Sequence, residues 1–229
     1  MLFRSTLPGC APWVFANAGG QGYYRSAYSP EVVGQMAASA ETELTSAERI
    51  TLLGDEWAQV RVGRHDIGDF LKLLEGLKSD GERAVVEIVG QRLRDIADDV
   101  TSDSDHSSYQ AWVRALLRPA AAELGWNPAP NESEERRSVR ANVLYTLGYA
   151  GGDPQAFEQA RALVERHLKE GAEADPTLFE TAVRLAAIRG DAALYDQYLE
   201  QARKLQAPEE RYLYQQALEI GRASCRERV

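Results

Sequence analysis

A pairing of a capping residue with proline, repeated along the chain, constrains the fold more than any other feature. Three such pairs occur: Ser29-Pro30, Asp153-Pro154 and Asp175-Pro176. The serine or aspartate side chain accepts hydrogen bonds from free N–H groups at a helix N-terminus, and proline suits the first helical turn because its φ angle is already set. Gly171 and Gly190 stand where helices are expected to end. From residue 30 onward the sequence therefore predicts helices joined by short turns.

The spacing of apolar residues between these signals predicts about ten helices. Consecutive antiparallel helices with short turns pack in pairs, and the pairs stack. The predicted fold class is therefore all-α, an irregular antiparallel helical-repeat superhelix of the HEAT or armadillo kind. The expected helices are 30–39, 46–62, 67–77, 82–99, 107–124, 133–147, 154–169, 176–189, 192–205 and 208–218.

The first thirty residues differ from the rest because they are rich in aromatic residues and glycine. Residues 12–17 and 23–28 flank the glycine-rich stretch 18–22. This pattern predicts two short β-strands around a glycine turn. Since two strands alone are only marginally stable, we interpret the segment as the edge of a sheet domain whose other strands are missing.

Both ends of the chain have sequences typical of translated sequencing adapters, namely residues 1–5 and 220–229. We set these ends aside as scars; the alternative is that 220–229 is a natural basic tail. Leaving them out removes four arginines and one glutamate, so the remainder is more acidic than the formal charge of −9 indicates. An acidic chain is a poor match for a nucleic-acid backbone, so no nucleic-acid partner is expected.

The composition favours a globular domain over a membrane protein. No stretch approaches the roughly 20 apolar residues that a spanning helix needs, so no membrane span is expected. Cys225 falls in the 220–229 end, which leaves Cys10 as the single cysteine of the remainder and allows no internal disulfide there. One cysteine does not distinguish the bacterial cytoplasm from an exported location, so the compartment stays undecided.

The three histidines, His65, His106 and His167, do not form an H-E-x-x-H zinc motif. His65 lies beside Asp66 and Asp69 at a predicted helix junction, where a metal site is conceivable, but Asp66 capping the next helix is the favoured interpretation. His167 is placed near a helix C-terminus, where its charge suits the helix dipole. No catalytic or metal-binding residue is therefore predicted.

The remaining polar and aromatic clusters favour structural interpretations. Asp99, Asp103 and Asp105 are interpreted as a solvated loop between helices, because the glycine and glutamate of a calcium-binding loop are missing. The run 134–137 of two glutamates and two arginines is expected on a solvated helix face. Residues with core-type surroundings are Trp57, Trp112 and Trp126.

Two ordered sets of residues carry a family resemblance. The residues are Trp13, Asn17, Gly22, Tyr23, Tyr24, Arg25 and Tyr28 in the first set, and Arg49, Asp55 and Trp57 in the second. The first set resembles the strand pair that ends the small β-sandwich domain of zinc aminopeptidases of the M1, aminopeptidase N (gluzincin) type. The second resembles the first long helix of the C-terminal, endoplasmic-reticulum-aminopeptidase-like domain of the same enzymes. Ser26 departs from the valine, and Ser29 from the aspartate, that this family usually has.

The resemblance implies a domain organisation and a role. Residues 6–29 would be the end of the β-sandwich domain, and 30–219 the C-terminal helical domain. The parent enzyme would remove N-terminal residues from peptides with a zinc ion held by motifs that this chain lacks, so the chain alone is expected to be inactive. Its partners would be the catalytic domain of the same polypeptide and peptide substrates.

In such an enzyme the helical domain would form the wall of the substrate chamber and contact the distal part of the peptide. Candidates for contact with a peptide carboxylate are Arg184, Arg189 and Arg203. Two other interpretations stay open: a free-standing helical-repeat scaffold that binds a protein or peptide partner in its concave face, and an independent enzyme that uses the His65 cluster. A scaffold has no need of two isolated strands, which favours the aminopeptidase interpretation.

Overall fold

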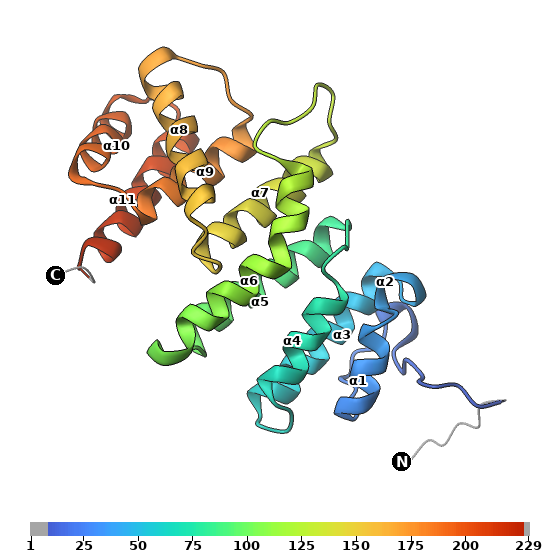
Figure 1. Cartoon of the computed structure of the whole chain (residues 1–229). Coiled ribbons are helices and arrows are strands. Elements are labelled where there is room, and N and C mark those ends of the chain that lie inside the picture. The colour runs from blue at the N-terminus through green and yellow to red at the C-terminus, as the bar shows by residue number, and fades with distance from the viewer. Residues whose placement is uncertain (1–8, 227–229) are drawn as a thin grey trace. The chain divides into compact units, whose positions relative to one another are not determined.

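The chain folds into α-helices throughout the part that its structure, a computed structural model, describes, which is residues 9–226 (Figure 1). Eleven α-helices and one short 3-10 helix, η1 (Ala18–Gly20), occur in this part. The all-α prediction is thus confirmed. The helices are α1 (Pro30–Ala37), α2 (Ala40–Glu43), α3 (Ser46–Arg61), α4 (Ile67–Gly76), α5 (Arg83–Asp99), α6 (Asp103–Leu124), α7 (Glu134–Tyr149), α8 (Pro154–Glu170), α9 (Pro176–Ile188), α10 (Ala192–Lys204) and α11 (Pro208–Arg226).

The chain divides into two compact units, residues 1–89 and residues 90–229, with the boundary inside α5. The first unit contains α1 to α4 and the start of α5, and the second contains the rest of α5 and α6 to α11. The predicted domain boundary between residues 29 and 30 stays a prediction, as does the superhelical form of the array.

Local capping explains where the helices of the first unit begin. The Ser29 side chain accepts a hydrogen bond from the Val32 N–H, and Thr45 and Glu48 form a reciprocal capping box at the start of α3. Helices α1 and α4 pack closely because Gly76 has no side chain, and a Cβ there would overlap the carbonyl oxygen of Ala37. The core of this unit consists mainly of Val33, Met36, Leu52, Leu53, Phe70, Leu73 and Leu74.

The second unit is built from helix pairs in two layers. Helices α6 and α7, α8 and α9, and α10 and α11 pack as pairs, and α9 also packs against α7 and α11. Helices α7, α9 and α11 thus form one layer, while α6, α8 and α10 form the other (Figure 1). The caps predicted from sequence are present, because Asp153 and Asp175 accept hydrogen bonds from the third residues of α8 and α9. Central core residues are Leu144, Ala160, Val164, Ala182, Val183, Leu185, Leu194 and Tyr198.

Most predicted helices are present to within two residues of their expected ends. Three differ: α2 is an additional short helix, α6 begins four residues before the expected Ser107, and the backbone of α11 stays helical as far as Arg226. The last difference carries α11 into the 220–229 end, whose final three residues lie outside the described part, as does the whole of the 1–5 end.

The prediction of two short β-strands before α1 is not confirmed. No strand is formed within residues 9–226, and residues 12–29 are extended chain around η1. A strand needs a neighbouring strand to take up its N–H and C=O groups, and here side chains take that place. The amide of Asn17 accepts from the Gly22 N–H at 2.7 Å and donates to the Gly22 carbonyl at 3.1 Å. These two hydrogen bonds between the Asn17 side chain and the Gly22 backbone close the loop.

The three predicted core tryptophans are only half-buried. Trp57 packs against Phe70 with 5.1 Å between ring centroids, and Trp112 lies 5.9 Å from Tyr109. Trp126 lies in the loop between α6 and α7 and lines surface hollows rather than the core. The smaller aliphatic residues fill the interior instead. Across residues 9–226, no helix combines the length and apolarity needed to cross a membrane.

Candidate functional site

The histidine cluster at the α3–α4 turn is a hydrogen-bonded pair of His65 and Glu56. His65 Nδ1 lies 2.7 Å from Glu56 Oε1, and both side chains are buried. Asp66 is the N-cap residue of α4, as expected, but its side chain makes no capping hydrogen bond. Among residues 9–226, no three His, Cys, Asp or Glu side chains gather closely enough to hold a metal ion. Within that described part, the side chains therefore offer no ligand set that fits a zinc ion.

The acidic residues before α6 do not form the predicted solvated loop. Asp103 and Asp105 belong to the first turn of α6, and Ser102 is its N-cap residue. The Ser102 hydroxyl lies 2.6 Å from the Asp105 carboxylate. Negative side chains in a first helical turn are stabilised by the free N–H groups there, so these carboxylates have a structural explanation.

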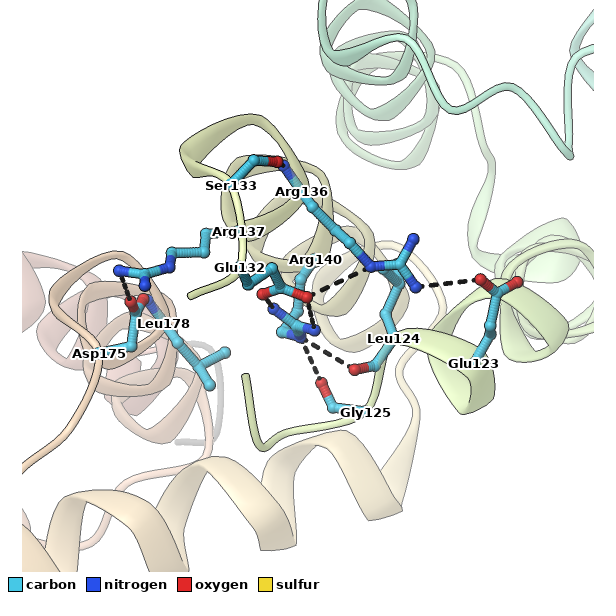
Figure 2. Close-up of polar contacts among 10 residues, drawn as sticks. All are labelled: Glu123, Leu124, Gly125, Glu132, Ser133, Arg136, Arg137, Arg140, Asp175 and Leu178. Atoms are coloured by element: carbon cyan, nitrogen blue, oxygen red, sulfur yellow. Dashed lines mark hydrogen bonds and ion pairs between the residues drawn. The ribbon is translucent and has the colours of Figure 1, made fainter. Parts of the chain in front are cut away.

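The charged run at the start of α7 belongs to a network that fixes the loop between α6 and α7 (Figure 2). The Arg140 side chain, 3% exposed, donates to the carbonyls of Leu124 and Gly125 at 3.0 Å and forms an ion pair with Glu132. Arg136 also pairs with Glu132, at 3.2 Å. These bonds cap the C-terminus of α6, so the network is structural.

Arg137, from the same run, reaches towards α9 (Figure 2). It forms an ion pair at 3.1 Å with Asp175, the N-cap residue of α9. Its side chain is half-buried, so the predicted solvated face is correct for Glu134, Glu135 and Arg136 but not for Arg137.

The family-motif residues before α1 build the loop of the first unit. The Tyr24 hydroxyl donates to the Ala16 carbonyl at 2.8 Å, and the Tyr28 hydroxyl accepts from the Ala16 N–H at 2.9 Å. Trp13 is half-buried, whereas Tyr23 is fully exposed. Most of these residues therefore hold the loop in shape, and Tyr23 is presented outward.

The motif residues near α3 join that loop to the helices. The buried Asp55 accepts from the Ser26 N–H at 2.9 Å and faces Arg25, whose guanidinium also donates to the Gly54 carbonyl at 2.7 Å. Burial raises the pKa of Asp55, and the Ser26 N–H and the Arg25 charge oppose that shift. Arg49 forms a buried ion pair with Asp80 at 2.9 Å.

The three arginines predicted to meet a peptide carboxylate lie in different surroundings. Arg184 on α9 is half-buried and bonds Glu180 at 2.8 Å and Gln216 at 2.9 Å. Arg189 follows α9 and stacks over the Phe157 ring, and Arg203 is exposed in the last turn of α10. The structure does not bring these three side chains together.

An arginine that sequence reasoning missed lies on α5 and contacts α7. Arg94 on α5 donates to the Thr146 hydroxyl at 2.5 Å, and its guanidinium carbon lies 5.4 Å from the centre of the Tyr145 ring. It has no carboxylate within 4 Å among the described side chains. Burial lowers the pKa of the Arg94 guanidinium, and the charges of Arg94 and Arg184 both act on the pKa of Tyr145. Arg94 is thus a partly desolvated cation without a salt-bridge partner within 4 Å in the described residues, although the charges of Asp95 and Asp98 act on its pKa.

A carboxylate stands on the same face of α5, one helical turn further on. The Tyr149 hydroxyl donates to both oxygens of Asp98, at 3.1 and 3.0 Å. Burial raises the pKa of Asp98, and the hydrogen bond from Tyr149 opposes that shift. Arg94, Asp98, Tyr145, Tyr149 and Arg184 are named here the α5–α7–α9 cluster.

Comparison with known protein families shows which family the chain belongs to. The sequence model described as the ERAP1-like C-terminal domain matches residues 13–223. The chain belongs to the ERAP1-like C-terminal domain family. The match covers both units, and it begins at Trp13, the first residue of the aromatic motif.

Curated relatives of this ERAP1-like domain include two named aminopeptidases. Puromycin-sensitive aminopeptidase of Caenorhabditis elegans is 28% identical over 155 residues, which are 65% of this chain and 16% of that protein. Aminopeptidase M1 of Arabidopsis thaliana is 24% identical over 159 residues, covering 68% of this chain and 18% of that protein. The ERAP1-like domain thus spans less than a fifth of the length of these relatives.

Proposed function

We propose that this chain is the non-catalytic C-terminal domain of a zinc metallo-aminopeptidase that removes N-terminal residues from peptides. Membership of the ERAP1-like C-terminal domain family and similarity to two proteins named aminopeptidases support the proposal. The zinc ion belongs to the part of the parent protein that precedes this chain. The helices form the wall of a substrate chamber and contact the part of the peptide that lies far from the cleaved bond.

The observation that carries the substrate contact is the uncompensated charge of Arg94. An arginine taken partly out of water loses hydration free energy, and a carboxylate partner normally offsets that loss. Arg94 has none within 4 Å in the described part of the chain, and burial lowers its pKa although the charges of Asp95 and Asp98 oppose that shift. A peptide supplies the missing partner through its C-terminal carboxylate, which a guanidinium binds with charge-assisted hydrogen bonds.

Arg184, on α9, is a second cation whose charge acts on Tyr145. Its side chain is one-third exposed, and its Nε atom is buried without a hydrogen-bond partner. Arg94 lies over the Tyr145 ring, and the charges of Arg94 and Arg184 both act on the pKa of Tyr145. An extended peptide that ends at this ring meets positive charge from α5 and from α9. In this proposal Arg94 is the main contact of the peptide carboxylate and Arg184 is a weaker, additional one.

The loop before α1 is proposed as the junction with the catalytic part of the same polypeptide. Tyr23 is fully exposed, and Val14 and Tyr24 are about half-exposed, on a loop held rigid by internal hydrogen bonds. A hollow of about 450 Å³ lies beside them, lined in part by Arg25 and Asp55. Exposed aromatic residues on a rigid loop are typical of surfaces that another domain covers.

The experiment compares peptides of one sequence that end in a free carboxylate or in an amide. Binding to the purified chain is measured by fluorescence anisotropy of an N-terminally labelled peptide. The protein, or an unlabelled competitor peptide, is titrated up to about 5 mM, because dissociation constants in the millimolar range correspond to only about 4 kcal/mol of binding free energy. The free acid is expected to bind more tightly than the amide, and Arg94→Met is expected to remove that difference. Arg203→Met is the matched control, because Arg203 is exposed and lies on α10.

Two results contradict the proposed contact. One is equal binding of the acid and the amide by the natural chain. The other is loss of the difference in Arg203→Met as well as in Arg94→Met, because a general reduction of positive charge would then explain the effect.

A further inference from the structure

Two opposite charges on one face of α5 are held apart by α7. Arg94 and Asp98 are four residues apart, a spacing at which arginine and aspartate on a helix normally attract each other. No ion pair within 4 Å joins them. The Arg94 guanidinium is instead bonded to Thr146 and lies over Tyr145, while Asp98 accepts from Tyr149. Side chains of α7 thus keep the cation and the carboxylate separate.

From this arrangement we infer that the α5–α7–α9 cluster selects peptides whose last residue carries a cationic side chain, such as lysine or arginine. The inference rests on the proposed function, which gives the C-terminal carboxylate to Arg94. Asp98 then receives the ammonium or guanidinium group of the same residue, and Tyr149 acts as the positioning residue that orients the Asp98 carboxylate.

The spacing of the two charges fits such a residue. Side chains four residues apart on a helix have Cβ atoms about 6 Å apart. A C-terminal lysine carries its carboxylate at one end of a flexible four-carbon stem and its ammonium group at the other, which spans a comparable distance. One residue therefore reaches both partners without ordering a second part of the peptide.

The electrostatics of the two groups agree with this assignment. Burial lowers the pKa of Arg94 and raises the pKa of Asp98, so each group is charged at some cost in the free chain. Asp98 is nevertheless an exposed residue that a ligand can reach, whereas Asp95 already bonds Gln91 and Arg92. A ligand with both charges relieves the two costs together.

The test uses four peptides of one sequence, ending in lysine or norleucine and in a free acid or an amide, with the full 229-residue chain. Norleucine keeps the carbon stem of lysine and removes its charge. We expect the lysine acid to bind about three- to fivefold more tightly than the norleucine acid, as for a partly exposed ion pair. Asp98→Asn is expected to abolish this preference and Tyr149→Phe to reduce it, while Asp99→Asn, the matched control, retains it.

Equal affinity for the lysine and norleucine acids overturns the inference, and so does loss of the preference in Asp99→Asn as well as Asp98→Asn. If the norleucine acid still binds better than its amide, the proposed carboxylate contact stands although the inference has failed. If acids and amides bind alike, or if no peptide binds, the proposed function itself is contradicted. Asp98→Asn is expected to weaken binding of the lysine acid and to leave the affinity for the norleucine acid unchanged. A loss of affinity for both acids contradicts the inference.

Discussion

Replacing Arg94 by methionine separates a ligand-binding role from a structural role. A structural arginine in this chain is well partnered: Arg140 donates to two carbonyls and pairs with Glu132 (Figure 2). Arg94 has a hydroxyl and a ring but no carboxylate within 4 Å in the described residues. Because its charge is partly desolvated without a counter-ion, removing that charge is expected to cost little folding free energy or to stabilise the chain.

The magnitudes follow from the contacts that each variant loses. Arg94→Met keeps an apolar stem against Tyr145 and loses two hydrogen bonds, one to Thr146 and one to the Gln91 side chain. Thr146 keeps Asn142 as a partner at 3.4 Å. The free energy of unfolding is expected to change by less than about 1 kcal/mol. Arg140→Met leaves two carbonyl oxygens without a donor, so it is expected to lose at least about 2 kcal/mol.

Both variants lie in the second unit, which makes them a matched pair. Urea unfolding followed by far-UV circular dichroism gives the midpoint and slope for each, and equal slopes allow the midpoints to be compared. If Arg94→Met lowers the unfolding free energy as much as Arg140→Met does, Arg94 is a structural residue, and the argument for an uncompensated cation is refuted.

Two further predictions concern the first unit. Arg49→Met is expected to cost about 3 kcal/mol because it leaves the buried Asp80 carboxylate without its cation, and Asp80→Asn in the same chain is expected to restore much of the loss. Burial raises the pKa of Asp80, and the charge of Arg49 opposes that shift. The Arg49→Met penalty is therefore expected to be smallest at acidic pH, where Asp80 is protonated, and to grow as pH rises through the folded-state pKa of Asp80. A penalty that grows on acidification contradicts this. Gly76→Ala adds a Cβ that would overlap the Ala37 carbonyl, so it is expected to lower the free energy of unfolding, measured by thermal unfolding, by about 1–3 kcal/mol. Gly68→Ala is the control, because the space around Gly68 is open. Equal losses in the two variants refute the close packing of α1 on α4.

Helix starts were predictable wherever the deciding interaction is local. Asp153 and Asp175 bond N–H groups three residues further along the chain, so proline and aspartate in sequence suffice to place α8 and α9. The start of α6 was misplaced because Asp103 and Asp105 read as a polar loop, although negative charge also stabilises a first helical turn. The same local chemistry permits both outcomes, and tertiary packing decides between them.

Features that depend on distant residues were not predictable. Strand-like residues before α1 form no strands in the described chain, because Asn17 and the tyrosines bond the backbone in place of a neighbouring strand. Arg94 and Thr146 are 52 residues apart, and nothing in either local sequence shows that they meet. Arg184 was selected only as one of several basic residues near the C-terminal helices, and its place beside Tyr145 required the structure.

The most direct test of the account is to read the complete open reading frame that contains residues 13–218 from the source DNA. An H-E-x-x-H motif, followed by a further glutamate about a helix downstream, is expected in the sequence encoded before Trp13. The reason is that the zinc ion of the proposed parent enzyme lies outside this chain. A frame that starts at Met1 and encodes no such motif would contradict the proposal, and the helices would then belong to a free-standing binding domain.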